Sequence, residues 1–197
     1  ETVVSAKEKC PDLTVVPPNY DLYNKSSKAL IKLLSEYTDK IEQYSIDEAF
    51  LDMTGCCDDS ERTAHEIKDR VHAQLGFTVN IGVSENKLLA KMASDFMKPD
   101  RVHTLWKSEI QTKMWPLPVS ELFYVGHASL NKLRKLGIHT IGELAATDPG
   151  ILQAHMKSQG LLIWQYANGI DDSKLIDVPL PAKGYGNSLT TPQDVTE

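Results

Sequence analysis

The adjacent acids Asp47 and Glu48, within the segment SIDEA at 45–49, are the first candidates for chemistry. Carboxylate oxygens are hard donors of the kind that Mg²⁺ takes in sites that handle phosphate. Neighbouring residues of a regular strand point to opposite faces, so both acids can hold one metal only where a turn or bulge lies. The flanking segments KIEQYS and EAFLDM would form the arms of such a hairpin. The alternative is an exposed acidic turn that binds no metal.

A second candidate is a basic stripe on the helix predicted after Ser84. At about 100° per residue, Lys87, Lys91 and Lys98 fall within about 40° of one another. A separate apolar surface comes from Leu88, Leu89, Met92 and Phe96. A lysine stripe beside a carboxylate edge suits the binding of a triphosphate. The alternative is an ordinary solvated helix face.

A third candidate is a helix–hairpin–helix unit made of PVSELF, a turn containing Gly126, and ASLNKLRKL. Such a turn exposes backbone N–H groups at a helix N-terminus, where they can bind a DNA phosphate. Lys132, Arg134 and Lys135 follow closely in the sequence. Binding of this kind reads no base sequence and is sensitive to salt. The alternative is a helical pair with a purely structural role.

The elements that must position these residues alternate in the first part of the chain. Apolar spacing and turn residues predict a helix ending near Cys10, a strand at 13–16 and a helix at 20–37. A strand or hairpin follows around 41–53, then a helix at 60–75 capped by Ser60, a strand at 77–83 and a helix from Ser84 to about 97. The expected class is α+β, a sheet with helices on one side.

After Leu105 the strand signals end, and short helices alternate with Gly and Pro. We therefore expect a small all-helical domain from about 109 to 170, with Pro149 at a helix start and Gly169 at a helix end. Residues 171–183 are expected to form a linker, and 185–190 an isolated strand. A single strand is not stable alone, and the chain begins with Glu1, so we expect a piece of a longer protein.

The amino-acid composition excludes several classes of protein. The 197 residues are 41% hydrophobic and 24% charged, which excludes a disordered or low-complexity chain. No stretch approaches the ~18 apolar residues of a membrane span. Three cysteines, two of them adjacent, argue against a disulfide framework or a zinc site, and favour a reducing, intracellular compartment.

The net charge of −6 disfavours nucleic acid as a partner when taken alone, but the charges are segregated. Residues 41–61 hold seven acids and no Lys or Arg, and residues 112–141 hold four bases and one acid. This asymmetry suits a protein that holds metal in one place and phosphate in another. The alternative is scattered surface charge.

Three segments, in this order, resemble the Y-family DNA polymerases, the UmuC/DinB-type translesion enzymes: YSIDEAFLD at 44–52, NIGVSENKLLAKMASDFMKP at 80–99 and FYVGHASLNKLRKLGIHTIGELA at 123–145. Two more resemble the family's fingers-to-palm junction and its entry into the little finger: VVPPNYDLY at 15–23 and KGYGNSLTTPQD at 183–194. The resemblance implies the end of the fingers at 1–16, a partial palm at 17–108, a thumb at 109–170, and a linker with the first little-finger strand at 171–197.

The resemblance also implies roles for single residues. Asp47 and Glu48 would bind the catalytic metals, Lys98 would contact the phosphates of the incoming nucleotide, and Gly126 would belong to the hairpin that binds DNA. The expected reaction is attack of a primer 3′-hydroxyl on the α-phosphate of a dNTP, with two Mg²⁺ ions per complete active site. The implied partners are primer–template DNA, dNTP and, through a region beyond Glu197, a sliding clamp; no membrane is expected. A bacterial, cytoplasmic and nucleoid-associated DNA-repair enzyme of the SOS response would fit.

Three departures from the family pattern qualify these expectations. No strand with a further metal-binding Asp precedes Asp47, so we expect the first carboxylate outside this chain and the chain alone to be inactive. Tyr124 replaces the first glycine of the hairpin's Gly-x-Gly, and because a bulky residue adopts positive φ with difficulty, the turn is expected to differ or to bind phosphate less well. Arg101 stands near a usual glycine, which predicts a reshaped loop.

Two other classes of function remain open. The first is a non-catalytic DNA-binding relative that uses the helix–hairpin–helix. The second is a hairpin-bearing nuclease or ligase, although the sequence shows no ligase lysine motif.

Overall fold

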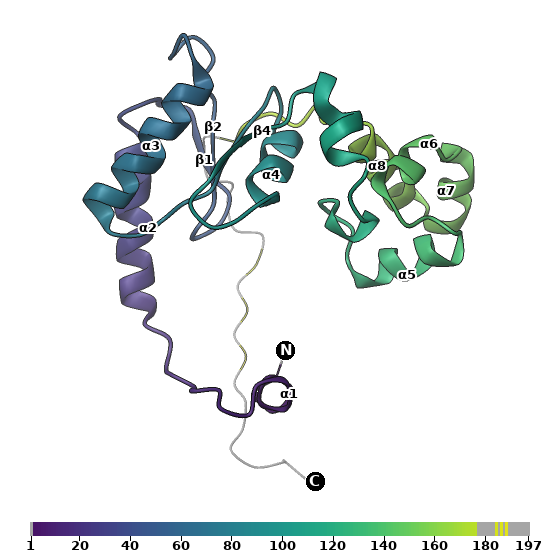
Figure 1. Ribbon diagram of the computed structural model, residues 1–197, viewed down its shortest axis with the longest axis horizontal. Coiled ribbons are helices and arrows are strands. Elements are labelled where there is room, and N and C mark those ends of the chain that lie inside the picture. Colours follow the sequence, from purple (N-terminus) through teal and green to yellow (C-terminus); the bar gives the residue numbers. More distant parts are fainter. Residues whose placement is uncertain (1, 177–183, 185, 187, 189–197) are drawn as a thin grey trace.

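The computed structural model describes residues 2–176 together with 184, 186 and 188. Figure 1 shows two lobes. The mixed lobe, residues 20–104, contains α2 (Tyr20–Leu34), α3 (Ser60–Leu75), α4 (Lys87–Asp95) and four short strands. The helical lobe, residues 107–167, contains α5 (His127–Lys135), α6 (Ile141–Ala146), α7 (Pro149–Met156) and α8 (Ser158–Ala167). The predicted α+β class with a following helical part is confirmed.

The N-terminal region differs in part from the prediction. Helix α1 (Val3–Lys9) ends before Pro11 as expected, lies apart from both lobes in Figure 1, and buries none of its residues. The strand predicted at 13–16 is wrong, since the segment is irregular and Val15 and Val16 are exposed. No strand among the described residues lies beside it to complete a ladder. Helix α2 ends three residues before the predicted Tyr37, in a turn closed by the Tyr37 N–H to the Leu34 carbonyl (3.0 Å).

The strands form two separate pairs. β1 (Ile41–Gln43) and β2 (Ala49–Leu51) are antiparallel, with Ile41 opposite Leu51, which confirms the predicted hairpin. β3 (Ile81–Val83) is parallel to β4 (Val102–Thr104), and α4 is the crossover between them. The predicted strand 77–83 is thus shorter, and β4 was not expected from the sequence.

Helices cover both faces of this layer, which corrects the expected one-sided cover. Ile41, Leu51 and Ile81 pack against the core of α2 and α3. Gly82 points the opposite way, and its Cα lies so close to α4 that an added Cβ would be 1.8 Å from the Ala90 carbonyl oxygen. In Figure 1, α2 and α3 accordingly lie on one side of the strands and α4 on the other.

Two predicted helix caps are shifted, one by a single residue and the other by two residues. Asp59, rather than Ser60, caps α3 by accepting the N–H of Arg62 at 2.9 Å. Asn86, rather than Ser84, caps α4 by accepting the N–H of Leu89 at 2.8 Å. Ser84 instead donates its hydroxyl to the carbonyl of Leu105 and ties the start of the α4 segment to the end of β4.

The helical lobe begins with η1 (Lys107–Glu109), η2 (Ile110–Met114) and η3 (Val119–Glu121). Asp148 caps α7 with Pro149 in its first turn, and Gly169 has φ +71 just after α8, both as the sequence predicts. The apolar side chains of α4 join the core of this lobe: Leu88, Leu89, Met92 and Ala93. Helix α4 therefore packs against both the strands and the helical lobe.

After α8 the chain returns to the mixed lobe. Asp171 accepts the backbone N–H of Leu88 at the start of α4 (3.1 Å), and Glu42 on β1 accepts that of Ile176 (2.8 Å). The predicted strand at 185–190 and most of the predicted start of a little finger lie outside the described residues. In the described part of the chain, no helix is both long and apolar enough to span a membrane.

Candidate active site and nucleic-acid interface

A tight turn carries the two predicted metal ligands. Residues 44–48, here called the acidic turn, connect β1 and β2, and the N–H groups of Tyr44 and Ser45 both donate to the Glu48 carbonyl, at 2.9 and 3.1 Å. Inside the turn, the Ser45 hydroxyl donates to Asp47 Oδ1 (2.6 Å) and accepts the Asp47 N–H (3.3 Å). Asp47 and Glu48 thus lie in a turn, which two adjacent residues need if they are to bind the same metal ion.

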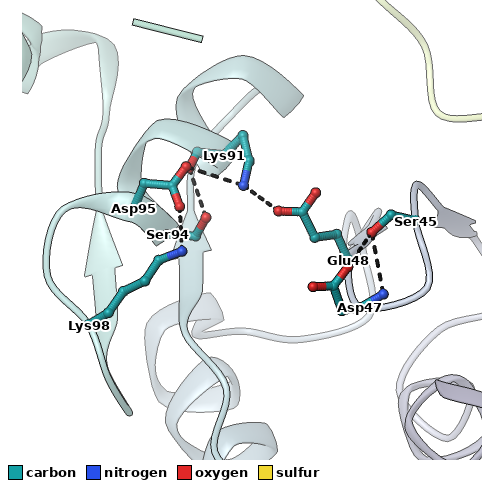
Figure 2. Close-up of polar contacts among 7 residues, drawn as sticks. All are labelled: Ser45, Asp47, Glu48, Lys91, Ser94, Asp95 and Lys98. Carbon is teal, nitrogen blue, oxygen red and sulfur yellow. Dashed lines mark hydrogen bonds and ion pairs between the residues drawn. The ribbon is translucent and has the colours of Figure 1, made fainter. Parts of the chain in front are cut away.

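The two carboxylates nevertheless have different partners. Figure 2 shows the Asp47 carboxylate beside Ser45, whereas the Glu48 side chain extends to Lys91 on α4 and forms an ion pair with it. Asp47 is exposed, and the Glu48 side chain is 38% exposed beside a Lys91 that is only 15% exposed. Both acids therefore lie at the same end of the β1–β2 hairpin, but their carboxylates do not point toward one shared metal position.

Lys91 is the second member of a chain of alternating charges (Figure 2). It also pairs with Asp95 Oδ2 at 3.2 Å, and Asp95 Oδ1 pairs with Lys98 at 2.7 Å. Burial opposes the charged forms of Asp95 and Lys91, but their hydrogen bonds outweigh it, so that the pKa of Asp95 is lowered and the pKa of Lys91 is raised. Lys98 and Glu48 thus lie at the two ends of one charge chain.

Lys87 and Lys91 of the predicted basic stripe lie on α4 and pair with the hairpin, whereas Lys98 lies beyond the end of the helix, which stops at Asp95 and not near 97 as predicted. Lys87 pairs with Glu42 at 2.7 Å, and its ammonium lies 5.2 Å from the centroid of the Phe50 ring. The side chains of this pair are 18% and 10% exposed. Lys98 is 56% exposed. Of the three lysines, Lys98 is therefore the one most accessible to a phosphate.

The acidic turn offers donor atoms of the kind that a divalent cation binds. Asp47 and Glu48 offer hard carboxylate oxygens, and Mg²⁺ commonly takes one or two carboxylates together with water and substrate phosphates. Within the described ranges, no group of three or more His, Cys, Asp and Glu side chains is arranged to hold a metal. These two residues would therefore form part of a coordination shell whose remaining oxygens come from other groups.

The turn that is predicted to bind phosphate lies between η3 and α5, but η3 is a 3₁₀ helix of three residues where the sequence predicted the longer helix PVSELF. Gly126 is the N-cap of α5 with φ −79, no side chain caps this helix, and nothing lies within 4 Å of the position of a Gly126 Cβ. Tyr124 adopts φ 69. Residues 123–126, here called the Gly126 turn, therefore have a left-handed residue at the position where the resemblance places the hairpin's first glycine, and the expected weaker binding of phosphate stays a prediction.

The three basic residues assigned to DNA binding lie at the other end of α5. Lys132, Arg134 and Lys135 are exposed and belong to the last turn of the helix. At 1.5 Å per residue, Lys132 is about 9 Å along the helix axis from Gly126. The structure therefore places the Gly126 turn and these side chains on one helix without bringing them to one phosphate.

Sequence reasoning missed two residues of this region. Asp95 links Lys91, four residues before it on α4, to Lys98, which lies three residues after it and beyond the end of the helix; the four-residue spacing from Lys91 was an available signal. Tyr44 closes the acidic turn through its backbone and contacts Phe123 of the helical lobe with its ring, at a centroid distance of 6.3 Å. No local sequence pattern predicts this contact, because Tyr44 and Phe123 are far apart in the sequence.

Comparison with known proteins finds DNA polymerases among the relatives of this chain. The sequence pattern of the impB/mucB/samB family matches residues 1–95. DNA polymerase IV of Clostridium acetobutylicum is 48% identical over 199 residues, which include all of this chain and 50% of the relative. DNA polymerase IV 1 of Bacillus subtilis is 42% identical over 202 residues, which include 99% of this chain and 48% of the relative. The chain thus spans about half the length of these curated relatives.

Solved structures share the fold. DinB from Sulfolobus solfataricus superposes with a TM-score of 0.78 at 26% identity, over 89% of this chain and 53% of that one. An insertion ternary complex of Dbh DNA polymerase has a TM-score of 0.75 at 27% identity, over 88% and 52%. A chimera described as a Y-family DNA polymerase matches equally well in TM-score. In sequence and in fold together, nearly the whole chain is similar to about half of a Y-family DNA polymerase.

Proposed function

We propose that the whole protein is a DNA polymerase of the translesion type, which transfers a nucleotide from a dNTP to a primer 3′-hydroxyl. The observation that carries this proposal is the exposed acidic turn beside the lysines of α4, in a chain that is 48% identical throughout to a DNA polymerase IV. Relatives with the same fold were solved as ternary complexes, one of them at the insertion stage. Primer–template DNA and dNTP are accordingly the proposed partners.

In this proposal Asp47 and Glu48 hold the divalent cations, with Mg²⁺ the expected ion and two per complete site. When bound, such ions lower the pKa of an attacking hydroxyl and neutralise phosphate charge. Ser45 orients the Asp47 carboxylate through the 2.6 Å hydrogen bond, and Lys91 holds Glu48 at the edge of the site. Lys98, exposed at the end of the charge chain, would contact the phosphates of the nucleotide.

The proposed DNA contact lies on the helical lobe. The uncapped N-terminus of α5 at Gly126 offers backbone N–H groups to a phosphate, as helix N-termini do in many anion sites. Lys132, Arg134 and Lys135, farther along the same helix, would contact other phosphates. Contacts of this kind favour no base sequence and weaken as salt concentration rises.

Primer extension by the whole protein, with Mg²⁺ and all four dNTPs, tests the proposal. We expect wild-type extension and a loss of at least about a hundredfold in Asp47→Asn, because a neutral amide is a poor Mg²⁺ ligand. Asp39→Asn, a change of the same charge at another exposed aspartate, is the matched control and should extend normally. Normal extension by Asp47→Asn would contradict the assignment. Separately, extension by residues 1–197 alone would contradict the expectation that this chain is inactive by itself.

One observation favours a second candidate, a DNA-binding relative without catalysis. Glu48 forms an ion pair with Lys91, and its carboxylate does not point to the same place as that of Asp47. The charge of Glu48 is therefore balanced without a metal ion. In that case the folded wild-type protein would bind primer–template DNA in a salt-sensitive way and extend no primer. The extension assay, run beside a binding titration on the same sample, distinguishes the two candidates.

A further inference from the structure

A row of aromatic rings connects the acidic turn to the helical lobe. Tyr44, Phe123, Tyr124 and Tyr166 form this row, here called the aromatic bridge. The ring centroids of Tyr44 and Phe123 are 6.3 Å apart, those of Phe123 and Tyr124 are 4.8 Å apart, and those of Tyr124 and Tyr166 are 5.8 Å apart. The last two pairs are edge-to-face, the arrangement that the ring quadrupoles favour.

At one end, the bridge is attached to the metal-ligand hairpin. The Tyr44 N–H donates to the Glu48 carbonyl at 2.9 Å, and the Tyr44 ring also contacts Phe50 on β2 with centroids 5.6 Å apart. A shift of the helical lobe would therefore be passed through the Tyr44 ring to the backbone that orients Glu48.

At the other end, the bridge holds the Gly126 turn in a strained conformation. Tyr124 has φ 69, and positive φ is a costly conformation for a bulky side chain. Its ring lies between Phe123 and Tyr166, and its carbonyl accepts the side-chain amide of Gln159 at 3.1 Å. A residue held in this way by its surroundings is a fixed point of the turn.

We propose that Tyr44 and Tyr124 are positioning residues that keep the acidic turn and the Gly126 turn in a fixed relation through the aromatic bridge. This inference rests on the proposed function, in which one turn holds the metals and the other grips a DNA phosphate. Tyr124 has a positive φ that glycine adopts more readily, so the ring contacts of the bridge hold a conformation that backbone freedom would otherwise supply. The expected consequence is that DNA held at α5 presents its primer end to the acidic turn in one orientation.

The contact across the lobes is tested first, without reference to catalysis. A double-mutant cycle of Tyr44→Leu and Phe123→Leu on urea unfolding should show a coupling of about two- to tenfold in the unfolding constant, as aromatic pairs do. The matched control is Tyr23→Leu, because Tyr23 is 45% exposed against 44% for Tyr44 and also has an edge-to-face partner. Tyr23→Leu should show no coupling with Phe123→Leu. An absent coupling for Tyr44 would overturn the bridge.

The positioning role is tested by single-nucleotide incorporation with the whole protein. Tyr44→Leu and Tyr124→Gly should each lower the maximal incorporation rate about tenfold, since small displacements of reacting groups are costly. In Tyr44→Leu, which leaves the residues of the Gly126 turn unchanged, the Kd for primer–template DNA should change less than twofold and keep its salt dependence. Tyr124→Phe, which keeps the ring, should restore the incorporation rate that Tyr124→Gly loses.

The double variant decides whether the two tyrosines act together. If they do, Tyr44→Leu combined with Tyr124→Gly should be no slower than the slower single variant, because either change already breaks the bridge. Rate losses that multiply, or a loss confined to DNA affinity, would overturn the positioning role. Wild-type protein that extends no primer would overturn the proposed function and this role with it, while the unfolding cycle would still report whether the ring contact exists.

Discussion

Replacing Gly82 with alanine should separate α4 from β3. The added Cβ would lie 1.8 Å from the Ala90 carbonyl oxygen and 2.6 Å from the Ser94 amide nitrogen, both of them backbone atoms of α4. Ordinary van der Waals contact begins at 3.4 Å, so the helix would have to move by about 1.6 Å at its closest point. No side-chain rotation can relieve this clash, because helix backbone cannot yield locally without losing hydrogen bonds.

We expect Gly82→Ala to lower the free energy of unfolding by about 3 kcal/mol, at the upper end of the usual cost of overpacking. For a protein of this size, each 1 kcal/mol lowers the Tm by about 2–4 °C, so the Tm should fall by about 6–12 °C. Because α4 carries Lys91 and Asp95, the same shift should disturb the ion pair that holds Glu48.

Urea unfolding followed by circular dichroism measures this cost as a lower midpoint at an unchanged slope. Gly150→Ala is the matched control: it is also a helical glycine, and the heavy atoms that its Cβ would approach within 4 Å belong only to the Asp148 side chain, at 3.0 Å and beyond. We expect this control to be neutral or slightly stabilising, because alanine is the better helix former. A Gly82→Ala protein within about 0.5 kcal/mol of wild type would refute the reasoning, since it would mean that β3 and α4 are not in backbone contact.

Three further predictions concern stability. Lys157→Gly should stabilise the protein by about 1 kcal/mol, raising the urea midpoint, because Lys157 is exposed and holds φ 58 and ψ −139, a conformation that glycine adopts with little strain. Lys87→Met should cost about 3 kcal/mol by leaving the carboxylate of Glu42 buried without its cation, and the double variant with Glu42→Leu should regain much of that loss; an equally unstable double variant would speak against the explanation. Two backbone N–H groups donate to Glu143 Oε2 (2.7 and 3.0 Å) and lower its pKa, so its contribution to stability should be complete above the ordinary pKa of glutamate and lost as pH falls through the lowered value. Unfolding titrations from pH 3 to 7 should show a shallower acid dependence in Glu143→Gln, and an unchanged dependence would contradict this.

Local sequence signals predicted the parts of the fold that depend on local chemistry. The three- and four-residue spacing of apolar residues predicted α3, and the apolar residues Ala64, Ile67 and Val71 of this helix are buried. The run of β-branched and aromatic residues on either side of Asp47 predicted the β1–β2 hairpin, and with it the turn that exposes the acidic pair. Pro149 and Gly169 marked helix ends, since each restricts or permits backbone angles by its own covalent structure.

The errors fall where distant residues decide the outcome. The strand expected at 13–16 is irregular, although its composition favours a strand, because a strand also needs a neighbour and none of the strands in the described residues lies beside this segment. β4 is only three residues long and has no periodicity of its own; it exists because its backbone pairs with β3 across the α4 crossover. Tyr124 adopts the positive φ that its own sterics disfavour because Phe123, Tyr166 and Gln159 hold it there.

The amino-acid sequence by itself determined that this protein has an acidic turn, a lysine-bearing helix and a glycine turn before a basic helix, because residue type and spacing along one element are sufficient for each. Only the tertiary structure decided how these parts meet. The pairing of Glu48 with Lys91, the burial of Glu42 against Lys87 and the contact of Tyr44 with Phe123 all join residues more than forty positions apart. Such contacts depend on the packing of whole elements against one another, which local propensity does not encode.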